Sequence, residues 1–172
     1  MLILIISPGY PADMPHFTRG LAEVGATVLG VGDSPSESLP EPARKALSGY
    51  LQVRSLWNIP SVVYELRAWL QGRQLDRIEC LWEAAMLVAA ELRQALGVPG
   101  LSVEATLPYR DKERMKQVLD AAGIRTPRHL PATQTGGLPS PLPARWKRCS
   151  AALTAPTPYP ASRTSRILSR TC

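Results

Sequence analysis

Cysteine, histidine and phenylalanine are scarce in this sequence of 172 residues, which has three Cys, two His and one Phe. The cysteines Cys80, Cys149 and Cys172 are far apart and odd in number, so they form neither a CxxC redox pair nor a zinc-ligand spacing. We expect free thiols. Neither His16 nor His129 has a partner at a spacing typical of a metal site or a catalytic triad. The sequence therefore predicts no metal ligands and no catalytic residue.

Long apolar runs are also missing. The longest covers residues 84–90, whereas a helix that crosses a bilayer needs roughly 20 apolar residues. The apolar residues 1–6 have no Lys or Arg before them, and Pro8, Pro11 and Asp13 follow at once, which does not fit a secretory signal. We therefore expect a cytoplasmic protein without membrane contact.

The two common glycine-rich phosphate motifs are absent. No GxxxxGK[ST] occurs, and the turn formed by Ser7, Pro8, Gly9 and Tyr10 has one glycine and not the GxGxxG spacing. A second candidate, Gly30-Val31-Gly32, lacks the third glycine. The sequence thus disfavours a dinucleotide site and a P-loop, and a Pro-Gly turn of this kind is more often structural than ligand-binding.

Acidic residues are missing from the last quarter of the chain. Residues 1–129 hold 14 basic and 14 acidic residues, whereas residues 130–172 hold six basic residues and none that is acidic. This segment also has seven of the 17 prolines and only six Leu, Ile, Val or Phe, too few to offset the entropy lost on folding. We expect one folded domain over 1–129 and a disordered tail over 130–172.

Two origins of this tail stay open. A reading-frame shift near residue 130 in a GC-rich gene would give such a mixture of Pro, Arg, Ala, Ser and Thr, and a genuine basic low-complexity tail is the alternative. Six cations without clustered aromatic residues form a weak footprint for nucleic acid. Binding of nucleic acid is therefore not expected.

Apolar runs and amphipathic periods alternate along the first 129 residues. The pattern predicts strands over 2–6, 27–31, 50–53 and 77–82, and helices over 14–24, 41–47, 58–70, 83–96 and 111–122. In the last helix we expect Met115, Val118, Leu119 and Ala122 to face inward. The alternation predicts an α/β fold with an open parallel sheet, in which ligands bind at the carboxyl ends of the strands.

Two charged features lie at or near those strand ends. Glu83 directly follows a predicted strand and begins a helix, where it could face a ligand or simply stabilise the helix dipole. Further on, Arg110, Lys112, Arg114 and Lys116 crowd the expected start of a helix, with acidic residues between them. Such a cluster is either an anion site or a solvated charged face.

Several short motifs occur in a recognisable order. Ser7-Pro8-Gly9 closes the first strand, an Ala-rich helix follows Glu83, Asp111-Lys112 precedes Met115-Lys116, and Ala122-Gly123-Ile124 leads to Thr126-Pro127. This succession resembles the amino-terminal part of ATP-grasp ligases, above all the carboxylate-amine ligase and biotin carboxylase-like branch. The resemblance covers residues 1 to about 130.

The resemblance implies a Rossmann-like pre-ATP-grasp domain and a set of site residues. Lys112 and Lys116 match the lysines of the family's pattern and would be nucleotide contacts. The turn from Ser7 through Pro8 and Gly9 to Tyr10, together with Glu83, would face the acceptor substrate. A full-length relative would use ATP and Mg²⁺ to form an acyl-phosphate from a small carboxylate and couple it to an amine.

The sequence departs from that family after Pro127. It lacks the Gly-rich loop, the early strand lysine and the acidic and Asn residues that hold magnesium in these ligases. We therefore expect an inactive amino-terminal fragment that binds neither ATP nor Mg²⁺ tightly. The alternative is a stand-alone α/β module that binds a small ligand or a partner. The sequence names neither substrate, and it is compatible with a homo-oligomer.

Overall fold

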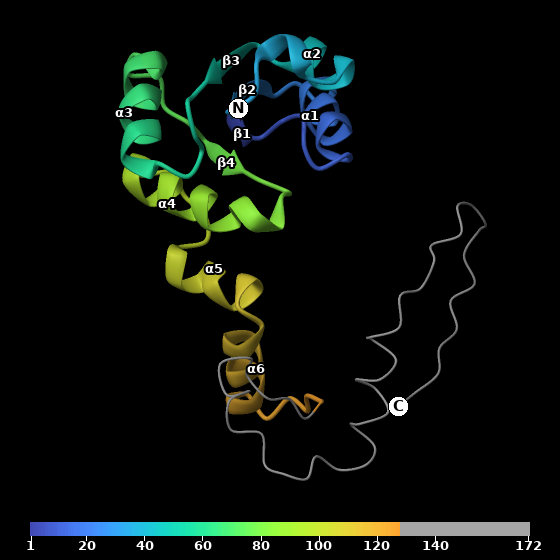
Figure 1. Ribbon diagram of the computed structural model, residues 1–172, viewed down its shortest axis with the longest axis vertical. Helices are drawn as coiled ribbons and strands as arrows, with labels where there is room; N and C mark the ends of the chain where they lie inside the picture. The colour runs from blue at the N-terminus through green and yellow to red at the C-terminus, as the bar shows by residue number, and fades with distance from the viewer. Residues whose placement is uncertain (128–172) are drawn as a thin grey trace, which may run out of the picture. The chain divides into compact units, whose positions relative to one another are not determined.

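The computed structural model describes residues 1–127, so the predicted tail over 130–172 lies outside the described residues. Four strands form one parallel sheet in the order β3-β2-β1-β4 (Figure 1). Their bounds are β1 (Leu2–Ile6), β2 (Thr27–Gly32), β3 (Gly49–Gln52) and β4 (Arg77–Glu79). The predicted α/β fold with an open parallel sheet is confirmed.

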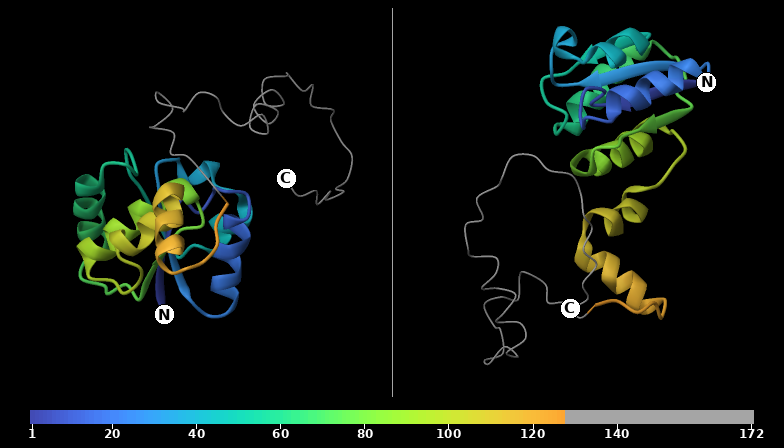
Figure 2. Two further views of the ribbon diagram at one scale, coloured as in Figure 1. Left: turned by 90° about the horizontal axis from the view of Figure 1, so that it is seen from below. Right: turned by 90° about the vertical axis from the view of Figure 1, so that its right-hand side faces the viewer.

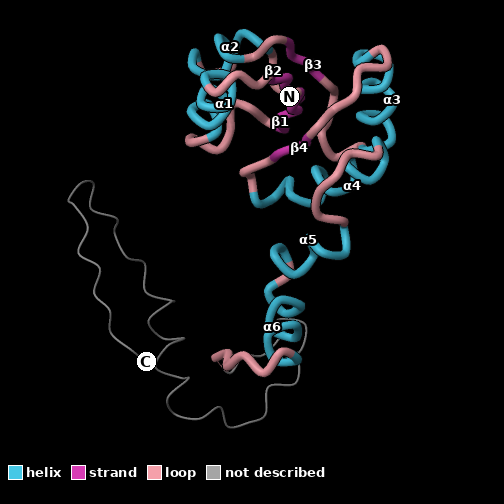
Figure 3. The backbone as a smooth tube through the Cα atoms, turned by 180° about the vertical axis from the view of Figure 1, so that it is seen from behind, coloured by secondary structure: helices cyan, strands magenta, loops and turns pink. Residues whose placement is uncertain are grey.

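Helices cover both faces of this sheet (Figure 3). They are α1 (Met14–Glu23), η1 (Ser36–Ser38), α2 (Glu41–Ala46), α3 (Ile59–Leu70), η2 (Glu83–Ala85), α4 (Met86–Leu96), α5 (Val103–Arg110) and α6 (Lys112–Ala121). The short helices η1 and η2 are 3-10 turns. One face of the sheet packs on α1, and the other packs on α3 and α4.

The position of β1 between β2 and β4 explains why its sequence is apolar without interruption. Because successive side chains of a strand point to opposite faces, Ile3 and Ile5 pack with Met14 of α1. Leu4 and Ile6 belong to the larger core cluster on the other face. All of these side chains are at most 2% exposed. A strand buried on both faces has no polar side in its pattern.

Local signals set the limits of α3, whose bounds agree with the predicted range 58–70 to within one residue. Asn58 caps the helix, and its Oδ1 accepts a hydrogen bond from the Ser61 amide at 3.3 Å. At the other end, Gln71 and Gly72 adopt left-handed φ values of 50° and 82°, a conformation that glycine takes without a steric cost. The apolar face of α3 buries Val62, Leu66 and Leu70.

The region from β4 to α6 differs from the prediction. β4 ends at Glu79 instead of continuing to residue 82, and the helix expected over 83–96 begins with the 3-10 turn η2. The sequence interpretation also missed α5, whose Pro108 lies inside the helix and disguised it. Its cap is clear, because Ser102 Oγ accepts a hydrogen bond from the Ala105 amide at 3.1 Å. As a result Arg110 ends α5 and does not begin the next helix.

The expectation of an inward apolar face on α6 is wrong. No residue of α6 is buried, and Val118 is 52% exposed. Met115 and Leu119 are half-buried, whereas Ala122, just past the helix, is exposed. The reason is tertiary, because α6 packs against α5 rather than on the sheet, and Figure 2 shows α4, α5 and α6 in succession leading away from the strands.

Candidate functional site

Three aromatic side chains meet at the carboxyl edge of the sheet. Tyr10 follows β1, Trp57 follows β3 and Trp82 follows β4, and parallel strands bring these loops to the same edge. The ring centroids of Tyr10 and Trp82 are 5.3 Å apart, and those of Trp57 and Trp82 are 5.6 Å apart, both with edge-to-face geometry. We call Tyr10, Trp57 and Trp82 the aromatic cluster.

A small ionic cluster adjoins the aromatic one. Glu83 follows Trp82 directly, and its Oε1 lies 3.9 Å from Arg110 Nη1 and 3.7 Å from Lys112 Nζ. Arg110 ends α5 and Lys112 begins α6, so the break between the two helices presents both cations to the turn after β4. The ammonium of Lys112 also donates a hydrogen bond to the Tyr109 carbonyl at 3.3 Å. The structure thus brings together two predicted site residues, Glu83 and Lys112.

The start of α6 is already satisfied by its own cap. Asp111 Oδ1 accepts hydrogen bonds from the amides of Glu113 at 2.9 Å and Arg114 at 3.1 Å. This carboxylate supplies the negative charge that the cationic helix start requires. A phosphate approaching Lys112 would therefore meet amides that are engaged already. Lys116, the other predicted nucleotide contact, lies one helical turn further along α6 and is half-buried.

The predicted turn from Ser7 to Tyr10 divides into a structural part and an exposed part. Ser7 has a left-handed φ of 53°, and its amide donates to the Val31 carbonyl at 2.8 Å. Pro8 is buried, and a Cβ on Gly9 would come within 3.1 Å of Leu39. Tyr10 is 57% exposed and contacts Trp82. Among these four residues, only the tyrosine is exposed.

The glycine pair of β2 serves packing. A Cβ on Gly30 would lie 2.9 Å from the Tyr50 ring, and one on Gly32 would lie 2.5 Å from its hydroxyl oxygen. Tyr50 Oη donates a hydrogen bond to the Ser34 carbonyl at 2.7 Å. Burial, helped by the nearby carboxylate of Asp33, raises the pKa of Tyr50 to about 12. These glycines make room for Tyr50, in agreement with their poor match to a nucleotide motif.

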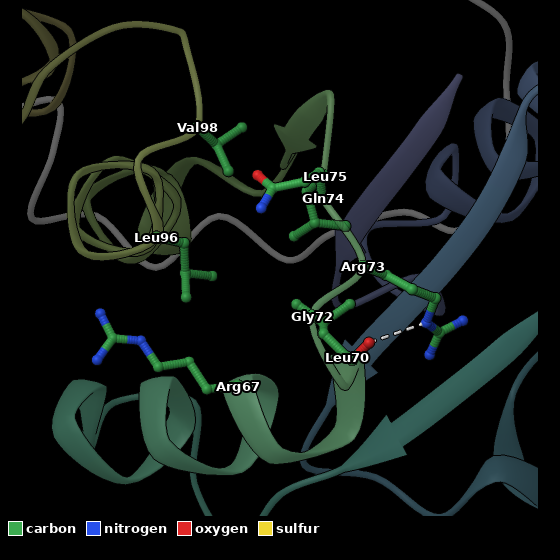
Figure 4. Close-up of a pocket in the computed structure, with 8 residues that line it drawn as sticks. All are labelled: Arg67, Leu70, Gly72, Arg73, Gln74, Leu75, Leu96 and Val98. Carbon is green, nitrogen blue, oxygen red and sulfur yellow. Dashed lines mark hydrogen bonds between the residues drawn. The ribbon is translucent and has the colours of Figure 1, made fainter.

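A cavity of about 280 Å³ lies at the opposite edge of the sheet, before β4 (Figure 4). Its two arginines are held by carbonyls near helix ends. Arg67 Nη2 donates to the Ala95 carbonyl at 2.8 Å, and Arg73 Nε donates to the Leu70 carbonyl at 3.1 Å. Cations at these positions offset the negative ends of α3 and α4. The arginines thus have a structural explanation that requires no ligand.

A second cavity, of about 300 Å³, lies beside β4 and includes Cys80. Arg93 is one of the residues that line it, and it donates from Nη1 to the Ile78 carbonyl at 2.8 Å and from Nε to the Leu101 carbonyl at 3.2 Å. This guanidinium ties the edge strand to the loop after α4. Burial raises the pKa of the Cys80 thiol, which makes the reactive thiolate scarcer at neutral pH. Cys80 is free, as predicted.

Two kinds of feature are absent from residues 1–127. None of the described helices is both long and apolar enough to span a membrane. No group of three or more His, Cys, Asp or Glu side chains in this part of the chain is placed to hold a metal ion. The Mg²⁺ that the resemblance implies for a complete ligase thus has no such group of ligands among residues 1–127.

Sequence reasoning missed part of the site. It singled out Tyr10 and Glu83 separately, but it gave no role to Trp57, and it placed Arg110 at the wrong end of a helix. One signal was available for Trp57, since it precedes the helix cap Asn58 after a predicted strand. Each aromatic residue of the cluster occupies such a position between a strand and a helix.

Comparison with known proteins relates the fold to that of a solved ligase structure. No family model matches the chain, and no curated protein matches it. Among solved structures, it is similar to the L-amino acid ligase from Bacillus licheniformis, with a TM-score of 0.60 and 20% sequence identity. The match covers 73% of this chain and 31% of the ligase. The chain thus shares the fold of a part of that ligase and spans less than a third of its length.

Proposed function

We propose that this chain is the amino-terminal domain of an ATP-dependent ligase that joins a small carboxylate to an amine, and that it is catalytically incomplete by itself. One observation carries the proposal. Lys112 and Glu83, distant in sequence and both selected by the motif pattern, lie 3.7 Å apart at the carboxyl edge of the sheet. The ligase fold that the chain shares in part supports the same assignment.

In this proposal Lys112 supplies a positive charge to a phosphate of ATP. Its side chain is 65% exposed, so exchanging the weak contact with Glu83 for a phosphate costs little. Lys116 would assist from the next helical turn. When bound, ATP provides the phosphoryl group that activates the carboxylate in the complete ligase. Glu83 and Tyr10 would face the substrate from the strand ends.

We expect the chain alone to bind ATP weakly and to leave its hydrolysis at background. A charge-assisted hydrogen bond contributes about 1.5 to 3 kcal/mol, which does not offset the roughly 4 kcal/mol or more of translational and rotational freedom lost on binding. The Asp111 cap also occupies amides that could otherwise contact phosphate. In the ATP-grasp ligases that the sequence resembles, the magnesium ligands belong to the part that follows Pro127.

The test uses an acyl-phosphate derivative of ATP, in which a nearby lysine amine attacks the acyl carbon, forms an amide and releases ATP. Peptide mass spectrometry then identifies the acylated lysines, with and without millimolar ATP as competitor. We expect ATP to suppress labelling of Lys112 and to leave Lys45 unchanged, since Lys45 pairs with Glu41 on the distant helix α2. Labelling that ATP suppresses equally at both lysines, or at neither, would overturn the nucleotide role.

The gene provides an independent test of incompleteness. A single-base correction near codon 130 that opens a frame with Gly-rich and acidic motifs supports the ligase fragment. An intact frame, with ligand binding at the strand ends and no protection of Lys112 by ATP, supports instead a stand-alone α/β module for a small ligand.

A further inference from the structure

We propose that the aromatic cluster binds the flat apolar group of a small carboxylate ligand, and that Arg110 binds its carboxylate. The ligand class is thus an aromatic carboxylate such as an aryl acid or an aromatic amino acid. The inference rests on the proposed function for the role of the ligand as a substrate. Binding itself depends only on the contacts at the carboxyl edge.

Two of the three residues of the aromatic cluster are more than half exposed. Trp82 is half-buried and packs against the main core, so it has a structural explanation. Tyr10 and Trp57 lean on Trp82 from two other loops and remain 57% and 54% exposed. Three rings contributed by three loops form an apolar surface at the edge where sheets of this type bind ligands.

The neighbouring charges select the sign of the ligand. Aromatic faces alone would also attract a cation. However, the ionic cluster contains one carboxylate, Glu83, against two cations, Arg110 and Lys112, and Glu83 contacts both. Asp111, between the two cations in the chain, adds a second carboxylate, but its Oδ1 is engaged by the amides of Glu113 and Arg114 at the positive end of α6. The cations remain available to an anion, and a guanidinium is well suited to a carboxylate.

The aromatic and ionic clusters are joined through the chain, because Trp82 and Glu83 are consecutive residues. We expect a ligand with one ring and one carboxylate to contact both clusters. Larger flat acids would extend over Trp57. A ligand that lacks either part would lose one set of contacts.

The test follows the indole N–H signals of the ¹⁵N-labelled full chain by NMR during titration with phenylacetate. The four tryptophans are Trp57, Trp69, Trp82 and Trp146, and single Trp→Phe variants assign their signals. We expect phenylacetate to shift the signals of Trp57 and Trp82 with saturation, and to leave Trp69 unmoved because that side chain lies under Arg73 and beside Gly49. Acetate and benzylamine, which carry the carboxylate alone and the ring with a cation, serve as the other two probes.

Two variants separate the contributions. Trp57→Ala should weaken phenylacetate binding roughly three- to tenfold, as expected for a lost aromatic contact, and Arg110→Gln should weaken it while leaving benzylamine unaffected. The matched control is Trp69→Phe, which should leave the affinity unchanged. Equal or tighter binding of benzylamine, or unchanged affinity in Trp57→Ala, would overturn the proposal. So would shifts that depend on protein concentration rather than on phenylacetate, since they would indicate contact between copies of the chain.

These results are distinguishable from those on the nucleotide. Phenylacetate binding without ATP protection of Lys112 would retain the aromatic carboxylate site and reject the ligase assignment. Protection of Lys112 by ATP without any effect of phenylacetate would retain the ligase assignment and reject the aromatic carboxylate site.

Discussion

Lys112 Nζ lies 3.7 Å from Glu83 Oε1, which links the start of α6 to the turn after β4. The same carboxylate oxygen lies 3.9 Å from Arg110 Nη1 at the end of α5. The three side chains are 48% to 65% exposed. The ion pairs thus place charges near the strand ends but contribute little to stability.

The first prediction concerns this ion pair. Glu83→Gln should lower the free energy of unfolding by less than about 1 kcal/mol, because solvent screens exposed pairs. Urea denaturation measures the change, and Glu41→Gln is the matched control, since Glu41 forms a similarly exposed pair with Lys45. A loss several times larger in Glu83→Gln than in the control would show that the ionic cluster holds the helices in place.

The second prediction concerns the glycines under Tyr50. Gly32→Ala should destabilise the fold by about 1 to 3 kcal/mol, because its Cβ would lie 2.5 Å from the Tyr50 hydroxyl oxygen. In a Tyr50→Phe background the same substitution should cost less, since that oxygen is gone. Gly20→Ala is the control, where no atom lies within 4 Å and alanine favours the helix by up to about 1 kcal/mol. Equal costs of Gly32→Ala in both backgrounds would contradict the packing role.

The third prediction tests the exposed face of α6. Val118→Ser should change the free energy of unfolding by no more than about 0.5 kcal/mol, because Val118 is 52% exposed. Leu66→Ala, at a fully buried position of α3, should cost about 2 to 5 kcal/mol. Thermal or urea unfolding compares the two. A large loss in Val118→Ser would mean that this face is covered in solution.

The fourth prediction follows from the raised pKa of Tyr50, which is about 12. The phenol binds its proton more tightly in the folded state than in the unfolded state, where its pKa is close to 10. Its contribution to stability is therefore complete below pH 10 and is lost as the pH rises from 10 toward 12. The stability difference between the native protein and Tyr50→Phe should shrink over that interval. Parallel pH profiles of the two proteins would contradict the assignment.

Sequence determined most of the sheet and the helices that cover it, because their patterns report local burial. The apolar run of β1 indicates a strand buried on both faces, and Asn58 and Gly72 mark the ends of α3 through caps that depend on neighbouring residues alone. By contrast, Pro108 hid α5, since a proline normally interrupts a helix. Periodicity also predicted a buried face on α6 that does not exist, because periodicity shows which residues share a face but not what covers it.

For the candidate site too, the sequence selected some of the residues and the tertiary structure supplied the others. Residue order along the chain was enough to select Tyr10, Glu83, Lys112 and Lys116 one by one, and their roles stay predictions. Only the tertiary structure brought Trp57 and Trp82 together and placed Arg110 beside Glu83. The physical reason is that side chains from different loops meet according to strand order and helix packing. These depend on contacts between residues far apart in the sequence, which local pattern does not encode.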